Sequence, residues 1–217
     1  MGWTSYHATH YKNGKIDRKA ECDAYFLDGL NRGHYDVLKS SMVGSTYYAA
    51  VKPLKKSGGK DENGNYIYVD MPKAEQFIFA VVFLTSTNQK DTKDYFNFSY
   101  KEMCETSGPY RRDCPKSVLD LLTPTESEWA NEWRKDCYEN LKKKKDPNKL
   151  SNLPVGTVIK VTMPFDTMLY QTGDVVTLTK RDGWSTKRPA WYSPRARFTA
   201  SLMKMLDGHY EIIKKGE

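Results

Sequence analysis

The chain has 217 residues, 39% of them hydrophobic and 13% aromatic, so it can bury the core of one generous domain or of two small ones. Its longest apolar run, residues 77–84, is far shorter than the roughly 18 residues that a membrane span needs, and no secretory leader pattern opens the sequence. We therefore expect a soluble cytoplasmic protein without a membrane partner. The net charge of +7 favours anionic partners such as nucleic acid, although such a charge also serves solubility.

The N-terminal region begins with a short strand and a helix. Residues 2–8 predict the strand, and the Asn13-Gly14 pair predicts a turn after it. Asp17 can then cap a helix that runs to about Asn31.

A β-rich stretch follows. Strands are expected over residues 35–43, 45–54 and 66–69, and the polar, glycine-rich residues 55–65 predict a mobile hairpin tip. The strongest strand signal covers residues 76–87, where β-branched and aromatic residues lack strict alternation. This pattern indicates a central strand buried on both faces, with an aromatic partner strand over residues 95–100.

Two helices are expected to cover this sheet. Pro115 occupies the first position of one of them, and residues 125–128 (TESE) have the pattern of a capping box that begins the second. Four side chains recur every fourth residue behind this box and predict one buried stripe: Trp129, Trp133, Cys137 and Leu141. The lysines at 142–145 complement the negative C-terminal end of the helix dipole.

The last third of the chain changes character. Residues 150–154 resemble a linker, and short strands over 157–163, 174–179 and 210–213 predict a small barrel of SH3-like size. We therefore predict an α+β fold, with an antiparallel sheet covered by helices in residues 1–149. A small SH3-like β-barrel is expected in residues 150–217.

The histidines and cysteines give little indication of chemistry. His7, His10, Cys104 and Cys114 could in principle bind zinc, but the cysteines are not closely paired as in structural zinc sites. Cys114 precedes a helix start, where a thiol can become nucleophilic, yet no histidine is near it in sequence. We expect no metal, no cofactor and no catalytic residue, and we expect Cys137 to pack in the core.

The strongest functional signal is a segment in which cations and aromatic rings are interleaved. Arginine and lysine pair with phosphates, and planar rings stack on bases, so this mixture predicts a nucleic-acid or partner surface. The alternative is that the tryptophans fill the barrel core while the cations remain solvated. The residues concerned are Lys180, Arg181, Trp184, Lys187, Arg188, Trp191, Tyr192, Arg195 and Arg197. Arg111 and Arg112, in a polar loop, form a secondary candidate surface.

Four segments resemble an uncharacterised family of phages and conjugative or other mobile elements of Gram-positive bacteria. They are MGWTSYHATHYKNGKIDRKAECD (1–23), LKSSMVGSTYYAAV (38–51), DCPKSVLDLLTPTESEWANEWR (113–134) and LPVGTVIKV (153–161). The resemblance implies an accessory protein of a mobile element in a bacterial host cell, of the kind that helps transfer or blocks host defences. It supplies no catalytic residue.

Three functional hypotheses follow. The first is a non-enzymatic binding protein that contacts nucleic acid or a nucleoprotein through the basic, aromatic segment. The second is an inhibitor of a host defence protein, similar to an anti-CRISPR protein, that acts by steric occlusion. The third is an enzyme that depends on a cysteine or on zinc.

Overall fold

The computed structural model describes residues 2–28, 31–88, 96–180, 189–191 and 206–217. The chain divides into two compact units, Met1–Leu141 and Lys142–Glu217, whereas the sequence predicts a division after residue 149. None of the described helices is long and apolar enough to cross a membrane.

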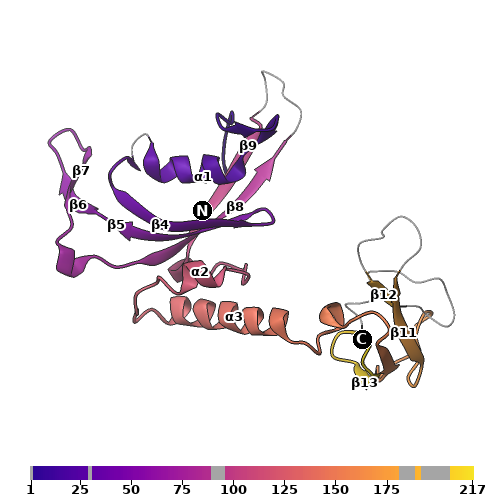
Figure 1. Cartoon of the computed structure of the whole chain (residues 1–217). Helices are drawn as coiled ribbons and strands as arrows, with labels where there is room; N and C mark the ends of the chain where they lie inside the picture. Colours follow the sequence, from indigo (N-terminus) through magenta and orange to yellow (C-terminus); the bar gives the residue numbers. More distant parts are fainter. Residues whose placement is uncertain (1, 29–30, 89–95, 181–188, 192–205) are drawn as a thin grey trace. The chain divides into compact units, whose positions relative to one another are not determined.

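The first unit is built on a five-stranded antiparallel sheet in the order β1-β9-β8-β5-β4 (Figure 1). Its strands are β1 (Thr4–Tyr6), β4 (Tyr35–Val43), β5 (Thr46–Pro53), β8 (Phe79–Thr87) and β9 (Phe98–Cys104). Helix α1 (Arg18–Leu27) covers one face, and α2 (Lys116–Leu119) and α3 (Glu128–Lys145) cover the other (Figure 1). The predicted antiparallel sheet covered by helices is therefore confirmed. The described residues of this unit also form the short 3-10 helices η2 (Lys73–Glu75) and η3 (Glu105–Ser107), while η4 (Leu150–Asn152) belongs to the second unit.

Burial on both sides of β5 and β8 produces two separate cores. Tyr47 and Phe83 lie in the core beneath α1, while Tyr48 and Val82 lie in the core beneath α2 and α3, and each is fully buried. Successive side chains of a strand point to opposite faces, so a strand covered on both faces has apolar residues without alternation. The prediction of a central strand over 76–87 is confirmed for residues 79–87.

Asp17 caps α1, as predicted. Its Oδ1 accepts hydrogen bonds from the backbone nitrogens of Lys19 and Ala20, both at 3.1 Å. The helix ends at Leu27 rather than near Asn31, because Asn31 donates from Nδ2 to the carbonyl of Tyr25 (3.0 Å) and so satisfies a C-terminal carbonyl from outside the helix.

Two hairpins extend from this sheet. The first joins β2 (Tyr11–Lys12) to β3 (Lys15–Ile16) through the predicted Asn13-Gly14 turn. The second joins β6 (Lys55–Lys60) to β7 (Tyr66–Asp70), and we call it the β6–β7 arm. The prediction of a mobile tip over 55–65 is therefore wrong for residues 55–60. The true turn, residues 61–65, is held by Asp61, whose carboxylate accepts hydrogen bonds from the backbone nitrogens of Asn63 and Asn65.

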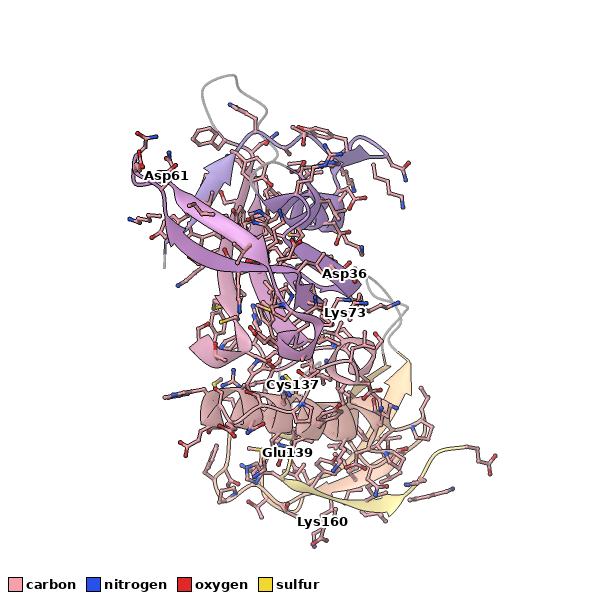
Figure 2. The ribbon with its side chains drawn as sticks, turned by 90° about the vertical axis from the view of Figure 1, so that its left-hand side faces the viewer. Asp36, Asp61, Lys73, Cys137, Glu139 and Lys160 are labelled. Atoms are coloured by element: carbon pink, nitrogen blue, oxygen red, sulfur yellow. The ribbon has the colours of Figure 1, made fainter. Side chains whose placement is uncertain are left out.

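The start of α3 differs from the predicted capping box. The helix begins at Glu128, and Ser127 rather than Thr125 accepts a hydrogen bond from the nitrogen of Ala130 (3.4 Å). Trp133 and Cys137 are fully buried as predicted, and Cys137 points from α3 toward the sheet (Figure 2). Trp129 is 66% exposed, which contradicts the predicted stripe, because it lies at the first turn, where its ring covers Gly108 instead of the sheet.

β9 runs from 98 to 104 rather than over the predicted residues 95–100. Its second half carries Lys101 and Glu102, which hide the strand pattern. Glu102 is accommodated because the Tyr25 hydroxyl donates to its carboxylate (2.8 Å), so a charged residue lies on a largely buried face with a partner. Pro115 directly precedes α2 rather than occupying its first position.

The second unit contains a four-stranded antiparallel sheet in the order β12-β11-β10-β13. The strands are β10 (Val158–Val161), β11 (Val175–Lys180), β12 (Pro189–Trp191) and β13 (Tyr210–Lys214). The described strands form an open sheet, so the predicted SH3-like barrel is not confirmed. The linker prediction for residues 150–154 is wrong, because Leu150 and Leu153 are buried in the core of this unit.

Candidate nucleic-acid interface

Net charge divides unequally between the two units. The first contains 19 Lys and Arg against 20 Asp and Glu, a net charge of −1, and the second contains 15 against 7, a net charge of +8. The excess positive charge of the chain thus belongs to residues 142–217. A polyanion is attracted to the region where cations outnumber acids, so this unit is the candidate interface.

The lysine run at residues 142–145 is the densest cationic group in the candidate interface. All four lysines are exposed at the C-terminal end of α3. The helix end is fixed by Asn152, whose Nδ2 donates to the carbonyl oxygens of Lys144 (2.7 Å) and Asp146 (2.9 Å). Because these carbonyls have a partner, the lysines project from a defined helix end.

The sheet of the second unit has an apolar inner face and a mixed outer face. Ile159 and Val161 are fully buried, whereas Lys160 between them is exposed and points away from the sheet (Figure 2). Glu211 of β13 lies directly opposite Lys160 in the register, and Lys214 pairs with Val158 beyond a shift in the register. The outer face therefore presents Lys160 next to an acid, and Lys214 is a further exposed cation at the end of β13.

Trp191 packs in the core of the second unit. It is 2% exposed among Ile159, Leu178 and Tyr170, and the Tyr170 hydroxyl donates to its carbonyl oxygen at 3.2 Å. Its indole nitrogen has no hydrogen-bond partner among the described residues. A buried ring is not available to stack on a base. At this position the tryptophan therefore fills the core, which was the alternative to a contact with nucleic acid.

The structure describes little else of the predicted basic, aromatic segment. The backbone of Lys180 ends β11 and lies opposite Pro189 of β12. The other predicted contact residues lie outside the described residues: Arg181, Trp184, Lys187, Arg188, Tyr192, Arg195 and Arg197.

Arg111 and Arg112 lie in the first unit, in a loop fastened to α3. Trp133 donates from its indole nitrogen to the carbonyl of Arg111 (2.7 Å), and Asn140 donates to the carbonyl of Arg112 (2.9 Å). The Arg112 guanidinium is paired with Asp136, with 2.9 Å between Nε and Oδ2. These contacts give Arg112 a structural role.

Two exposed apolar side chains in the second unit were missed by the sequence analysis. Phe165 is 58% exposed and Met168 is 92% exposed, in the loop between β10 and β11. The loop is ordered by Thr167, whose hydroxyl accepts from the Tyr170 nitrogen (3.0 Å), and by Asp166, which accepts from the Thr172 nitrogen (3.0 Å). An exposed phenyl ring in a positively charged unit can stack on a base. The sequence feature that could have indicated this pair of exposed side chains is that both apolar residues lie among turn-forming residues.

The described cysteines and histidines do not cluster as a metal site would require. No group of three potential metal ligands occurs in the described part of the chain, and His10 instead lies 3.3 Å from the buried carboxylate of Glu21. Cys114 is fully buried, and burial raises the pKa of its thiol, which disfavours the nucleophilic thiolate. Cys137 packs in the core, as predicted.

Comparisons with protein-family models, with curated proteins and with solved structures found no match for this chain. The residues themselves are therefore the basis of the functional argument.

Proposed function

We propose that this protein is a non-enzymatic accessory binding protein whose second unit contacts nucleic acid or a nucleoprotein. The observation that carries the proposal is the division of charge, +8 on residues 142–217 against −1 on residues 1–141. A protein that neutralises phosphates releases condensed counterions, and this release supplies most of the non-specific affinity for nucleic acid.

The described lysines of the second unit are available for such contacts. None of them has a described carboxylate within 4.0 Å, whereas Lys19, Lys52, Lys56 and Lys116 of the first unit each form an ion pair. The ammonium group of a lysine without a carboxylate partner is available to pair with a phosphate. Phe165, which follows β10 in the sequence and is 58% exposed, supplies a ring that bases can stack on.

The test is fluorescence anisotropy with labelled single-stranded DNA, duplex DNA and RNA across a salt series. The affinity should fall steeply as salt rises, because each phosphate contact contributes about 0.7–0.9 to the slope of log affinity against log salt. Replacing Lys143, Lys144 and Lys145 with Gln should lower both the affinity and this slope.

A matched control separates location from total charge. Lys39, Lys73 and Lys135 are exposed lysines of the first unit, and their replacement with Gln changes the net charge by the same amount. This control should leave the affinity nearly unchanged. Equal losses in the two triple variants would refute an interface in the second unit, as would the absence of binding to all three probes at low salt.

A protein-directed inhibitor, similar to an anti-CRISPR protein, is the second candidate. The observation that favours it is the β6–β7 arm, where Tyr66, Ile67, Tyr68 and Val69 are 42–63% exposed. An exposed apolar strand is suited to a protein partner. Immobilised protein should then retain a specific host protein that the Tyr66→Ser, Tyr68→Ser variant does not retain. An origin in a phage or mobile element and a cytoplasmic location in a bacterial host remain predictions.

A further inference from the structure

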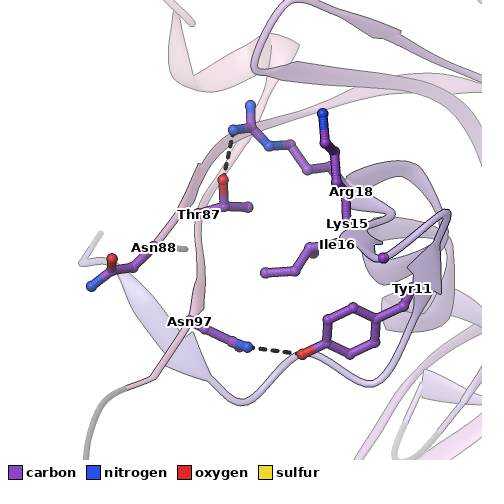
Figure 3. Close-up of a pocket in the computed structure, with 8 residues that line it drawn as sticks. Tyr11, Lys15, Ile16, Arg18, Thr87, Asn88 and Asn97 are labelled. Atoms are coloured by element: carbon purple, nitrogen blue, oxygen red, sulfur yellow. Dashed lines mark hydrogen bonds between the residues drawn. The ribbon is translucent and has the colours of Figure 1, made fainter. Parts of the chain in front are cut away.

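A cavity of about 460 Å³ opens in the first unit between the β2–β3 hairpin, the start of α1 and the ends of β8 and β9 (Figure 3). This volume lies within the range of small-molecule pockets. The side chains that give the cavity its character are Tyr11, Lys15, Ile16, Arg18, Thr87 and Asn97. The cavity belongs to the unit with a net charge of −1, so its chemistry is separate from the cationic second unit.

The hairpin wall of the cavity is anchored by a buried carboxylate. Glu21 is 2% exposed, and its Oε1 accepts hydrogen bonds from the backbone nitrogens of Thr9 and His10, both at 2.5 Å. The nitrogen of Asp17 donates to the carbonyl of His10 (2.9 Å) and closes the hairpin onto α1. Hydrogen bonds within the protein thus hold this wall in place, and a wall that is already ordered lowers the entropy cost of binding a ligand.

The orientation of Asn97 makes its side of the cavity a hydrogen-bond donor. The buried Asn97 accepts at Oδ1 from the nitrogen of Ala8 (2.7 Å), which fixes its amide. Its Nδ2 therefore faces Tyr11 and donates to Oη at 2.9 Å (Figure 3). Since Tyr11 Oη accepts this hydrogen bond, the phenolic proton is left to donate into the cavity.

The opposite side of the cavity also presents donors. Arg18 donates from Nη2 to Oγ1 of Thr87 (2.7 Å), so the hydroxyl proton of Thr87 is directed elsewhere (Figure 3). The guanidinium keeps further N–H groups, and Lys15 adds an ammonium group on the same side (Figure 3). Among the described residues, no carboxylate lines the cavity, and neither cation has a carboxylate within 4.0 Å. Within this described lining, a wall of donors with two cations and no acid is complementary to an oxyanion.

Between the two polar sides lies an apolar wall. Tyr11 and Ile16 are cross-strand partners in the hairpin, and both side chains line the cavity. We propose that the cavity binds a small phosphate monoester, with the phosphate at Arg18 and Lys15 and the organic group against Tyr11 and Ile16. A guanidinium suits a phosphate because it donates two parallel hydrogen bonds to two oxygens.

The experiment uses the full chain with three probes: adenosine monophosphate, inorganic phosphate and adenosine. Calorimetric titration should show that adenosine monophosphate binds. In a parallel NMR titration, the backbone amide shifts should change at Lys15, Arg18 and Asn97. Inorganic phosphate should compete with it, and adenosine should bind far more weakly. Shifts confined to other regions, or equal affinity for adenosine, would overturn the proposal.

Variants test the two cations separately. Arg18→Gln and Lys15→Gln should each weaken adenosine monophosphate binding by about tenfold or more, since each removes a charge-assisted hydrogen bond. Lys15 forms no described side-chain bond within the protein, so its replacement tests the site even if the Arg18 variant folds poorly. Lys39→Gln, an exposed change of the same kind on β4, should have no effect. Unchanged affinity in Lys15→Gln and Arg18→Gln would refute the site.

Two further measurements distinguish this site from the proposed nucleic-acid interface. The variant with Gln at 143, 144 and 145 should retain adenosine monophosphate binding, because those lysines belong to the other unit. An oligonucleotide without a terminal phosphate should not displace adenosine monophosphate from the cavity. Displacement would show that the cavity binds the backbone phosphates of the oligonucleotide and would overturn the assignment to a small monoester.

Discussion

Arg134 holds the carboxylate of Glu105 at two points, with 2.7 Å between Nε and Oε2 and 2.6 Å between Nη2 and Oε1. Glu105 is 2% exposed, and Nη1 of the same guanidinium donates to the carbonyl of Thr123 at 2.6 Å. The arginine of α3 is therefore connected to η3 by a buried ion pair and to the segment before α3 by a hydrogen bond. Breaking such a pair from one side leaves an uncompensated buried charge.

Replacing Arg134 with Met should lower the free energy of unfolding by about 3–5 kcal/mol, because the Glu105 carboxylate would remain buried without its partner. Urea denaturation followed by circular dichroism measures this change. Lys116→Met provides the control, since it breaks an exposed ion pair with Asp120 and should cost about 0.5 kcal/mol or less. A loss below about 1 kcal/mol in Arg134→Met would show that water reaches the Glu105 carboxylate.

The second prediction concerns the helix end that carries the lysine run. Asn152→Ala removes the donor to the carbonyls of Lys144 and Asp146 and should cost about 1 kcal/mol locally. Hydrogen exchange should accelerate at the amides of residues 142–149, where the helix end frays, and remain slow at the buried part of α3 around Trp133. Asn148→Ala is the control, since the described residues show no hydrogen bond from its side chain. Equal exchange in both variants would remove Asn152 as the determinant of this helix end.

The third prediction concerns alkaline pH. Burial, and then the hydrogen bond from Tyr47 to the Asp23 carboxylate (2.7 Å), raise the pKa of Tyr47 above its ordinary value. The unfolded chain ionises at about pH 10, whereas the native tyrosine stays neutral. This group's contribution to stability is therefore fully present below about pH 10 and is lost as pH rises above it.

The free energy of unfolding should thus decline above about pH 10, and the decline should be shallower in Tyr47→Phe. The difference in absorbance at 295 nm between the unmodified protein and Tyr47→Phe should show that Tyr47 ionises only as the protein unfolds. Tyr66→Phe, at a 63% exposed position on the arm, should not change the slope. A native protein in which Tyr47 titrates near pH 10 without unfolding would contradict the prediction.

The elements that could be predicted are those whose signal is local. The strands over 35–43 and 46–53 follow from residue types within each segment, and the Asp17 cap acts over only three residues. Strand β6 was not predictable from its polar, glycine-rich residues, because its pairing with β7 depends on the partner strand. Trp129 was misplaced because periodicity defines a helix face but not where the helix first meets the sheet.

The cavity could not have been predicted for a related reason. Tyr11 and Asn97 are 86 residues apart, and they meet only because β1 pairs with β9 at the edge of the sheet. A single sequence does not reveal which distant strands are neighbours, so the donors of this cavity appeared as unrelated polar residues. The charge division, in contrast, could be read from the sequence once the boundary between the units was known.

The last prediction concerns the four cysteines. Burial raises the pKa of Cys22 and Cys114, and it raises the pKa of Cys137 to about 12, while Cys104 is only half-buried on β9. The thiolate is the reactive form, and a reagent must also reach the sulfur. At pH 8 the native protein should therefore react rapidly with Ellman's reagent at one thiol, and the protein in guanidinium at all four.

Cys104→Ser should abolish the rapid phase and leave the denatured count at three, whereas Cys114→Ser should leave the rapid phase intact. Rapid modification of a second thiol in native Cys104→Ser would mean that one of the two cores opens at a low free energy, either the core beneath α1 or the core beneath α2 and α3. Because Cys22 lies in the first of these cores and Cys114 and Cys137 lie in the second, the identity of the labelled cysteine would show which face of the sheet opens.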